Sequence, residues 1–335
     1  ISKYIACPLR FYYEEICRYR EEQSPSLLLE ANEFGSILHA SMEAIYRELT
    51  CSSDSGNTHT LIEPERIQEK LRTKGFVRRI VEEQYREQLK LGGKKELSGL
   101  GLIYCHSIEQ YVRQILELDL TFAPFEYQES EKRHYTSFPL SSGERVYFGG
   151  IIDRVDKVGS RLRVVDYKTG SEETRMPKWD LLLDSKYKAI LQTLIYCAFL
   201  AESGVPTDEI YPAIYMLRGD YGLMVKGKGY DPLVQLPAET NGKASDATEL
   251  PASPSPDQSS LLSEGNSLKG SGAKSPKKPK KLQTTLLSYA EAEAPFREVF
   301  IHGVLDELYD ASTPFAQTPK EDNCRYCPFA LSCGR

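Results

Sequence analysis

The feature that most constrains this chain is a hairpin pattern in residues 149–170, where two strand-like runs flank the dipeptide Gly159-Ser160. A two-residue loop that begins with glycine is typical of a type II′ turn between antiparallel strands. With that turn, Asp156 lies opposite Arg163, and this opposite-charge pair supports the register. The pattern therefore predicts two paired strands and states which of their residues face each other.

Three charged residues share one face of the predicted hairpin. In this register Asp153 lies opposite Asp166, with Cβ atoms about 5 Å apart, and Lys168 follows two residues later on the same side. Opposed carboxylates destabilise a hairpin unless a cation neutralises them, and their oxygens suit Mg²⁺ or Mn²⁺. Such an ion activates water and polarises a phosphoryl oxygen. A nearby ammonium can orient that water or stabilise the charge that develops on the phosphorus centre. The alternative is a surface hairpin with ordinary solvated charges.

Two other segments can present polar side chains to such a site. His39 lies in a predicted helix over residues 31–49. Gln192 and Tyr196 have the i, i+4 spacing that places both side chains on one face of another helix. A lone helical histidine is more often a surface or core residue, and the glutamine can be a polar interruption of a buried helix. Neither motif therefore identifies a function by itself.

The cysteines indicate a second site. Cys324, Cys327 and Cys333 have C-x2-C-x5-C spacing, and three thiols that close together seldom arise by chance. A tetrahedral all-thiolate zinc site or a [4Fe-4S] cluster needs a fourth ligand. Four other cysteines are predicted to be unpaired thiols: Cys17, Cys51, Cys105 and Cys197.

Taken in order, these motifs resemble the PD-(D/E)XK nuclease superfamily, and specifically its RecB-like branch. The matching segments read GGIIDRVD and VVDYKTG, and they contain the family pattern of Asp, then Asp-x-Lys. The resemblance runs from Cys7 to Cys333 apart from one insertion. It looks most like the C-terminal nuclease domain of AddB-type helicase–nuclease subunits, or a free-standing exonuclease of the same kind.

The resemblance implies roles for the residues of the first site. Four groups would bind Mg²⁺ or Mn²⁺: His39, Asp153, Asp166 and the backbone carbonyl of Tyr167. Lys168 would position or activate the attacking water, and Gln192 and Tyr196 would orient the site and the nucleic-acid backbone. In some relatives a glutamate also approaches the metal, and the sequence leaves three candidates: Glu126, Glu129 and Glu131.

The resemblance also implies that Cys7 supplies the distant fourth thiolate of an iron–sulfur staple with Cys324, Cys327 and Cys333. A staple between the two ends of a domain closes a long loop, which stabilises the fold by several kcal/mol in the simple chain-entropy model, as an order of magnitude. Cluster binding would then be coupled to folding. A structural Zn²⁺ site is the alternative, and disulfides are a weaker one.

Composition sets broader limits. The 335 residues include 40% hydrophobic residues, enough for a sizeable core, and no run approaches the roughly 18 apolar residues of a membrane span. The net charge of −6 is unlike that of a simple DNA-coating protein, so DNA binding would use a local positive groove. Five residues are candidates for that groove: Lys132, Arg133, Arg154, Lys186 and Lys188.

Two further features concern the origin of the chain. It begins with Ile1, directly in a motif, which suggests that it is a fragment of a longer protein. Its free cysteine thiols are typical of proteins in the reducing cytoplasm.

We expect an α/β fold with a restriction-endonuclease-like core, in which helices flank a mixed central sheet, and an added helical subdomain. The division is a single nuclease domain over 1–335, with a helical subdomain at 50–122, a disordered insertion at 237–283, and a C-terminal helix and cysteine cluster at 284–335. Helices are expected over 1–22, 31–49, 64–91, 96–119 and 288–310. Strands are expected over 134–140, 144–153, 161–168, 209–217 and 222–228, with the three glutamates ahead of the first.

The leading hypothesis is a metal-dependent DNA exonuclease or end-processing nuclease in DNA repair or recombination. The DNA would be single strands or duplex ends, and a helicase domain or subunit is an expected partner. The chain has no Walker A sequence, so any motor lies elsewhere. Three alternatives stay open: a non-catalytic DNA-binding or scaffold module, a CRISPR-associated exonuclease, and a redox or regulatory role for the cysteine cluster.

Overall fold

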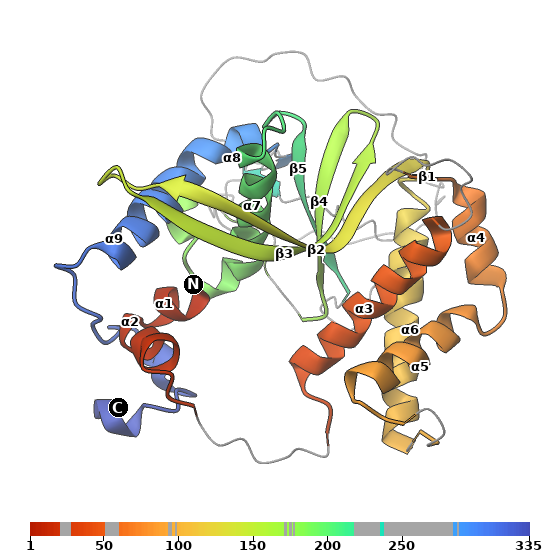
Figure 1. Ribbon diagram of the computed structural model, residues 1–335, viewed down its shortest axis with the longest axis horizontal. Helices are drawn as coiled ribbons and strands as arrows, with labels where there is room; N and C mark the ends of the chain where they lie inside the picture. The colour runs from red at the N-terminus through yellow and green to blue at the C-terminus, as the bar shows by residue number, and fades with distance from the viewer. Residues whose placement is uncertain are drawn as a thin grey trace, which may run out of the picture.

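A five-stranded mixed sheet in the order β1-β2-β3-β4-β5 forms the centre of the computed structural model (Figure 1). Neighbouring strands are antiparallel from β1 to β4, and β5 runs parallel to β4. The strands are β1 (Thr60–Ile62), β2 (Phe125–Pro139), β3 (Arg145–Val158), β4 (Arg161–Lys168) and β5 (Ile210–Met216). The structure describes residues 1–20, 28–50, 60–92, 96–97, 99–170, 173, 176, 178–217, 235–237, 284–286 and 288–335. A separate two-stranded ladder pairs β6 (Gln235–Pro237) with β7 (Thr284–Leu286).

Helices pack on both faces of the sheet (Figure 1). One face carries α3 (Ala31–Thr50), α4 (Pro64–Arg72), α5 (Phe76–Gln88) and α6 (Gly99–Asp119). The other face carries α7 (Lys188–Glu202) and the C-terminal run of α8 (Tyr289–Phe296), a π-helical segment (Arg297–Leu305) and α9 (Asp306–Tyr309). In the part of the chain that is described, no helix has both the length and the apolar character of a membrane span.

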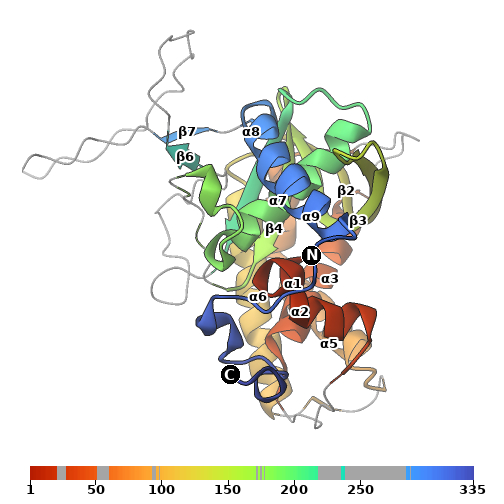
Figure 2. The same ribbon diagram turned by 90° about the vertical axis from the view of Figure 1, so that its left-hand side faces the viewer.

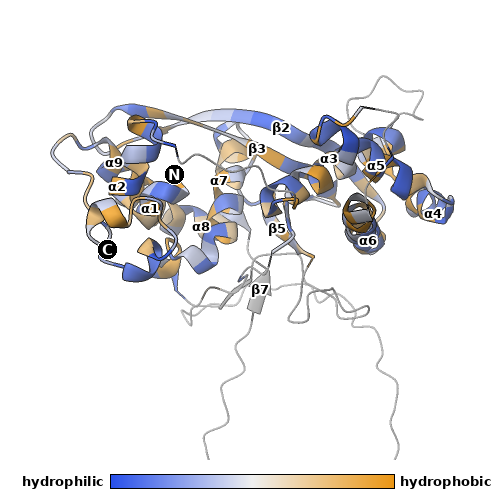
Figure 3. Ribbon diagram, turned by 90° about the horizontal axis from the view of Figure 1, so that it is seen from below, coloured by the Kyte–Doolittle hydropathy of each residue, from blue (hydrophilic) through white to orange (hydrophobic). Residues whose placement is uncertain are grey.

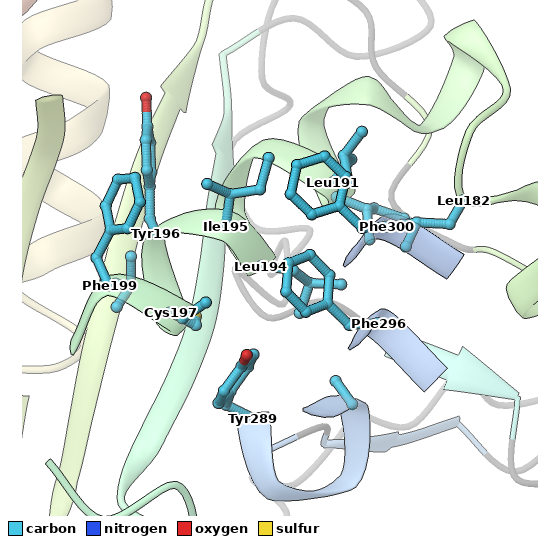
Figure 4. Packing of buried hydrophobic residues seen from close by; sticks show 14 of the residues in the cluster. Leu182, Leu191, Leu194, Ile195, Tyr196, Cys197, Phe199, Tyr289, Phe296 and Phe300 are labelled. Carbon is cyan, nitrogen blue, oxygen red and sulfur yellow. The ribbon is translucent and has the colours of Figure 1, made fainter. Parts of the chain in front are cut away.

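Each face of the sheet has its own apolar core, because successive side chains of a strand point to opposite sides. On β4, Val164 packs with the α7 core, whereas Val165 and Tyr167 pack with the core under α3, α5 and α6. The α7 core is visible in Figure 4, where side chains of α7 meet Phe296 and Phe300 of the C-terminal helical run. The expected restriction-endonuclease-like architecture, a mixed sheet flanked by helices, is confirmed.

Two predicted helices are broken in the structure. The helix expected over 1–22 consists of α1 (Ser2–Ala6), α2 (Pro8–Phe11) and a π-helical turn that ends at Ile16. Its break is at Cys7, which is extended with φ −164° and ψ 110°, because a proline disfavours helical geometry in the residue before it. The helix expected over 64–91 is interrupted between α4 and α5, where Gly75 adopts a left-handed φ of 75°.

The first long strand also differs from the expectation. We expected the three glutamates to precede a strand that begins at residue 134, but β2 begins at Phe125 and contains all of them. A register shift between Tyr127 and Glu129 marks a bulge in this part of the strand. The expected helix over 31–49 and the strand near 209–217 are confirmed by α3 and β5. Two expectations lie outside the described residues: the strand over 222–228 and the disordered insertion, of which only Pro237 in β6 is described.

The two ends of the chain lie side by side, as Figures 1 and 2 show. The Leu9 backbone N–H donates to the Ala316 carbonyl at 3.1 Å, and the Asn323 side-chain amide donates to the Ala6 carbonyl at 2.8 Å. The ring of Phe315 stacks on Phe11. These contacts bring the segment around Cys7 to the C-terminal cysteines.

Candidate active site

The β3–β4 hairpin positions the two central carboxylates. Gly159 has a left-handed φ of 61°, while Ser160 does not have a positive φ, which fits the predicted type II′ turn. The strands pair in the predicted register from Val158–Arg161 to Arg154–Val165. The next residues on the two strands are Asp153 and Asp166, and both are buried.

The predicted cross-strand ion pair is present and buried. Arg163 donates from Nε to Asp156 Oδ1 at 2.6 Å and from Nη2 to Asp156 Oδ2 at 2.7 Å. Such a bidentate contact has a defined geometry. It therefore helps to hold the register that sets the positions of Asp153 and Asp166.

Three potential metal ligands meet at the end of this register. His39 on α3, Glu131 on β2 and Asp153 on β3 each offer one ligand atom, and these atoms lie within 4.8 Å of one another. His39 Nδ1 is 3.0 Å from Glu131 Oε1 and 3.6 Å from Asp153 Oδ1. We call these three residues the acidic cluster. One imidazole and two carboxylates are donors that suit a divalent cation.

Glu131 is the residue that the sequence left undecided. Of the three candidate glutamates, only Glu131 belongs to the acidic cluster. Glu129 instead pairs with Lys132 at 2.6 Å and with His134. Glu131 also has a φ of 47°, an uncommon left-handed conformation for a residue other than glycine.

The protonation of the acidic cluster reflects crowded negative charge. Burial and the charge of Asp166 raise the pKa of Asp153 to about 7, although His39 and the Tyr167 N–H act in the opposite direction. Burial lowers the pKa of His39, but the charges of Asp153 and Glu131 outweigh it and raise this pKa to about 9. A divalent cation would replace the protons that these groups hold without it.

A hydrogen-bonded chain runs from Asp166 to α7. Lys168 Nζ lies 2.8 Å from Asp166 Oδ2 and donates to Gln192 Oε1 at 2.9 Å. Gln192 Nε2 donates in turn to the Tyr196 hydroxyl at 2.7 Å. The predicted residues of the strand and the helix are therefore brought together by direct contacts.

The predicted ligands Asp166 and Tyr167 lie next to the acidic cluster without belonging to it. Asp166 acts on the cluster through its charge, which raises the pKa of both Asp153 and His39. The backbone N–H of Tyr167 donates to Asp153 Oδ2 at 2.8 Å and orients that carboxylate. Asp153 Oδ1 is left facing His39.

Arg154 does not contribute to a positive surface, contrary to the sequence-based expectation. Its side chain is fully buried and makes two bonds of 2.9 Å to the carboxylate of Asp119 at the end of α6. It also contacts the hydroxyls of Tyr46, Tyr167 and Tyr215. A buried guanidinium needs a buried counter-charge, so Arg154 ties α3 and α6 to the strands that carry the site.

Two hollows open onto the site. One has a volume of 570 Å³ and is lined by His39, Glu131 and Ile151, among others. The second, of 180 Å³, is lined by Gln192, Tyr196 and Gly150. A side chain at position 150 would lie 3.0 Å from the Phe199 ring, so the close packing of the strand against α7 favours glycine there.

The four cysteines of the predicted staple approach one another from the two ends of the chain. Cys7 is buried, while Cys324, Cys327 and Cys333 are partly exposed. Burial and the neighbouring thiols of Cys327, Cys7 and Cys324 raise the pKa of Cys333, which places all four within electrostatic reach. Cys17, Cys105 and Cys197 are free thiols, and Cys51 lies outside the described residues.

Comparisons with known proteins agree with this geometry. A family model described as the PD-(D/E)XK nuclease superfamily matches residues 1–334. The chain is also similar to a subunit of the ATP-dependent helicase/deoxyribonuclease of Acetivibrio thermocellus, with 28% identity over 226 residues. That match covers 64% of this chain and 18% of the longer protein.

Proposed function

Because the chain belongs to the PD-(D/E)XK nuclease superfamily, we propose that it is a divalent-metal-dependent deoxyribonuclease that hydrolyses phosphodiester bonds. The observation that carries the proposal is the position of the acidic cluster directly beside the Asp166–Lys168–Gln192 chain. A bound divalent cation and a fixed ammonium can both assist phosphodiester hydrolysis, by activating water and by offsetting charge on the phosphoryl oxygens.

Each residue has a distinct role in the proposed mechanism. His39, Asp153 and Asp166, with the carbonyl of Tyr167, would hold Mg²⁺ or Mn²⁺, and Glu131 adds a further carboxylate. The bound cation would lower the pKa of a water molecule and polarise a phosphoryl oxygen.

The remaining residues position Lys168. Asp166 and Gln192 hold its ammonium from two sides, so it can orient the attacking water and offset charge that develops on the phosphoryl oxygens. Tyr196 fixes the amide of Gln192, whose oxygen is thereby kept toward Lys168. Gln192 and Tyr196 also line the smaller hollow, where a nucleic-acid backbone would approach them.

The similarity to a helicase/deoxyribonuclease subunit supports a finer proposal. The chain would act as an exonuclease or end-processing nuclease on single strands or duplex ends, in DNA repair or recombination. A helicase domain or subunit would deliver the DNA, because the chain itself has no Walker A sequence. Free cysteine thiols support a reducing compartment such as the cytoplasm.

We further propose that Cys7, Cys324, Cys327 and Cys333 hold a structural [4Fe-4S] cluster. Four converging thiols fit such a group. The same four thiols could also hold a single tetrahedral Zn²⁺, and iron together with sulfide in metal analysis would distinguish the cluster from zinc.

The test is degradation of single-stranded DNA by the anaerobically purified chain, with and without Mg²⁺ or Mn²⁺. We expect metal-dependent loss of DNA that disappears in Asp166→Ala. We expect the same of Lys168→Ala, which should keep its fold and its DNA binding. A matched Lys74→Ala control, on the exposed turn between α4 and α5, should keep its activity. Metal-dependent cleavage by Lys168→Ala would refute the mechanism, and a folded, cluster-loaded chain that binds DNA without cutting it would support the binding module.

A further inference from the structure

One face of the β2–β3 hairpin carries no helix in the part of the chain that the structure describes. The hairpin packs its inner face on the α7 core through Phe138, Val146 and Ile152, all of them buried. In Figure 3 the helices α1, α2, α7, α8 and α9 lie on this inner side. The outer face consists of three directly opposed pairs: Arg133–Ile151, Tyr135–Gly149 and Ser137–Tyr147. We call these six residues the tyrosine face.

The aromatic side chains of the tyrosine face are strongly exposed. The exposed fraction is 84% for Tyr147 and 72% for Tyr135, and Ile151 is also exposed. The ring of Tyr135 covers Gly149, because a side chain at position 149 would come within 2.6 Å of its Cδ1. One side of this ring is therefore held against the strand, and its other side is open to solvent.

The charge of this face is opposite to that of the chain. The pairs contain Arg133 and no carboxylate, although the whole chain has a net charge of −6. Arg145, two residues before Tyr147, is held along the hairpin by its Nε, which donates to Ser137 Oγ at 2.9 Å, and by its Nη2, which donates to the Ser137 carbonyl at 2.6 Å. Two arginines thus flank exposed aromatic rings. This combination suits binding of a negatively charged polymer that carries planar aromatic groups.

The tyrosine face continues into the candidate active site. Ile151 lines the larger hollow together with His39 and Glu131. Asp153 lies two residues further along β3. With a rise of about 3.3 Å per residue, Tyr147 is about 20 Å from Asp153 along the strand.

We infer that the tyrosine face binds single-stranded nucleic acid, whose bases stack on Tyr135 and Tyr147 while Arg133 and Arg145 contact its phosphates. Stacking on aromatic rings beside basic side chains is how strands are bound without regard to sequence. A duplex hides the faces of its bases, so the face selects unpaired strands. The inference rests on the proposed function, because it names the form of DNA that reaches the site and the path it takes.

The experiment measures the affinity of the full chain, in an Asp166→Ala background that leaves strands uncut, for a fluorescent single-stranded oligonucleotide. Stacking contributes about 1–3 kcal/mol per base, so Tyr135→Ala/Tyr147→Ala should weaken binding at least tenfold. Tyr135→Phe/Tyr147→Phe keeps the rings and should bind within about threefold of the parent. Tyr309→Ala removes an exposed tyrosine of α9, 54% exposed, and serves as the control.

An oligonucleotide with abasic sites provides the decisive comparison, because it keeps the phosphates and lacks the bases. The parent should bind it at least tenfold more weakly than the intact strand, and the double alanine variant should bind both strands equally. Equal affinity of the parent for both strands, or unchanged binding by the alanine variant, overturns the inference. The inference is also overturned if the double alanine variant keeps its affinity for the strand and loses binding to a protein instead.

Cleavage is measured separately in chains that retain Asp166. Strand binding that depends on the tyrosines, without metal-dependent cleavage, would leave the inference standing and remove the proposed function. Cleavage together with tyrosine-independent binding would do the reverse.

Discussion

At the scale of single residues, Glu131 is the ligand candidate that only the structure identifies. Its Oε1 lies 3.0 Å from His39 Nδ1, whereas Glu129, two residues earlier, is engaged by Lys132 and His134. We expect Glu131→Gln to weaken Mn²⁺ binding by about 10-fold to 100-fold, because a neutral amide is a poorer ligand than a carboxylate. Calorimetric titration with Mn²⁺ measures this, with Glu129→Gln as the matched control. Equal losses in the two variants would contradict a specific role for Glu131.

The titration of the acidic cluster leads to a second prediction. In the metal-free protein Asp153 has a pKa of about 7 and His39 of about 9, both above their unfolded values of about 3.9 and 6.5. A raised folded-state pKa contributes stability at low pH, and that stability is lost as the pH rises through the folded value. Metal-free stability should therefore fall between about pH 4 and pH 9, first through Asp153 and then through His39.

Metal binding should have the opposite dependence on pH, because it requires an ionised Asp153 and a neutral His39. The gain in Tm from Mn²⁺ over a chelator should therefore increase, by on the order of several degrees, from pH 6 to pH 9. Thermal unfolding at fixed free Mn²⁺ measures this gain. A gain that is the same at both pH values would count against the cluster as the metal site.

The sequence was sufficient for the part of the site that depends on local pairing. The two-residue turn and the Asp156–Arg163 pair predicted the register that leads to Asp153 and Asp166, and that register is observed. Glu131 could not be predicted in this way, because the bulge between Tyr127 and Glu129 changes which residues of β2 share a face. A bulge depends on the partner strand and has no clear signal in one sequence.

At the scale of secondary-structure elements, the buried ion pair of Arg154 and Asp119 joins the helical layer to the sheet. Both side chains have no exposed surface, and Asp119 also accepts a hydrogen bond from Tyr215 at 3.0 Å. We expect Asp119→Ala to lower the free energy of unfolding by about 3–5 kcal/mol, because it leaves a buried guanidinium without its main partner. Denaturant unfolding measures the loss.

The matched control is Arg79→Ala, which breaks an exposed ion pair between Arg79 and Glu83 on α5. Exposed pairs contribute about 0–1 kcal/mol, so this variant should stay close to the parent. A loss below about 1 kcal/mol for Asp119→Ala would show that the buried pair adds little to stability.

The prediction that Arg154 belongs to a positive surface was wrong because its main partner is distant in sequence. An arginine close to two aspartates in a strand is typical of a solvated residue, and nothing local indicates that Asp119, 35 residues earlier, is its partner. Helix breaks are different, because the sequence does contain their signals. Pro8 after Cys7 and Gly75 before α5 are such signals, and the apolar periodicity on either side obscured them.

At the scale of the whole molecule, the two ends of the chain meet at the cysteines. The Asn323–Ala6 hydrogen bond joins residues 317 positions apart, and Cys7 and Cys324 are their direct neighbours in sequence. A link across so long a loop stabilises the folded protein by about 5 kcal/mol in the chain-entropy model, because it lowers the conformational entropy of the unfolded chain. Hydrogen bonds exposed at a surface contribute far less, near 1 kcal/mol each.

If the four cysteines hold a common metal cluster, Cys7→Ser should release it and lower the Tm by on the order of 10 °C, whereas Cys17→Ser, ten residues later in the same segment, should do neither. Metal analysis and visible absorbance of the anaerobically purified chain measure the occupancy, and iron with sulfide distinguishes the cluster from zinc. Both variants should retain the register of the β3–β4 hairpin, because no cysteine contributes to it. A nuclease defect in Cys7→Ser would then arise from loosening of the ends of the chain. A Tm equal to that of Cys17→Ser would mean that the apolar packing of Phe11 on Phe315 is enough to join them.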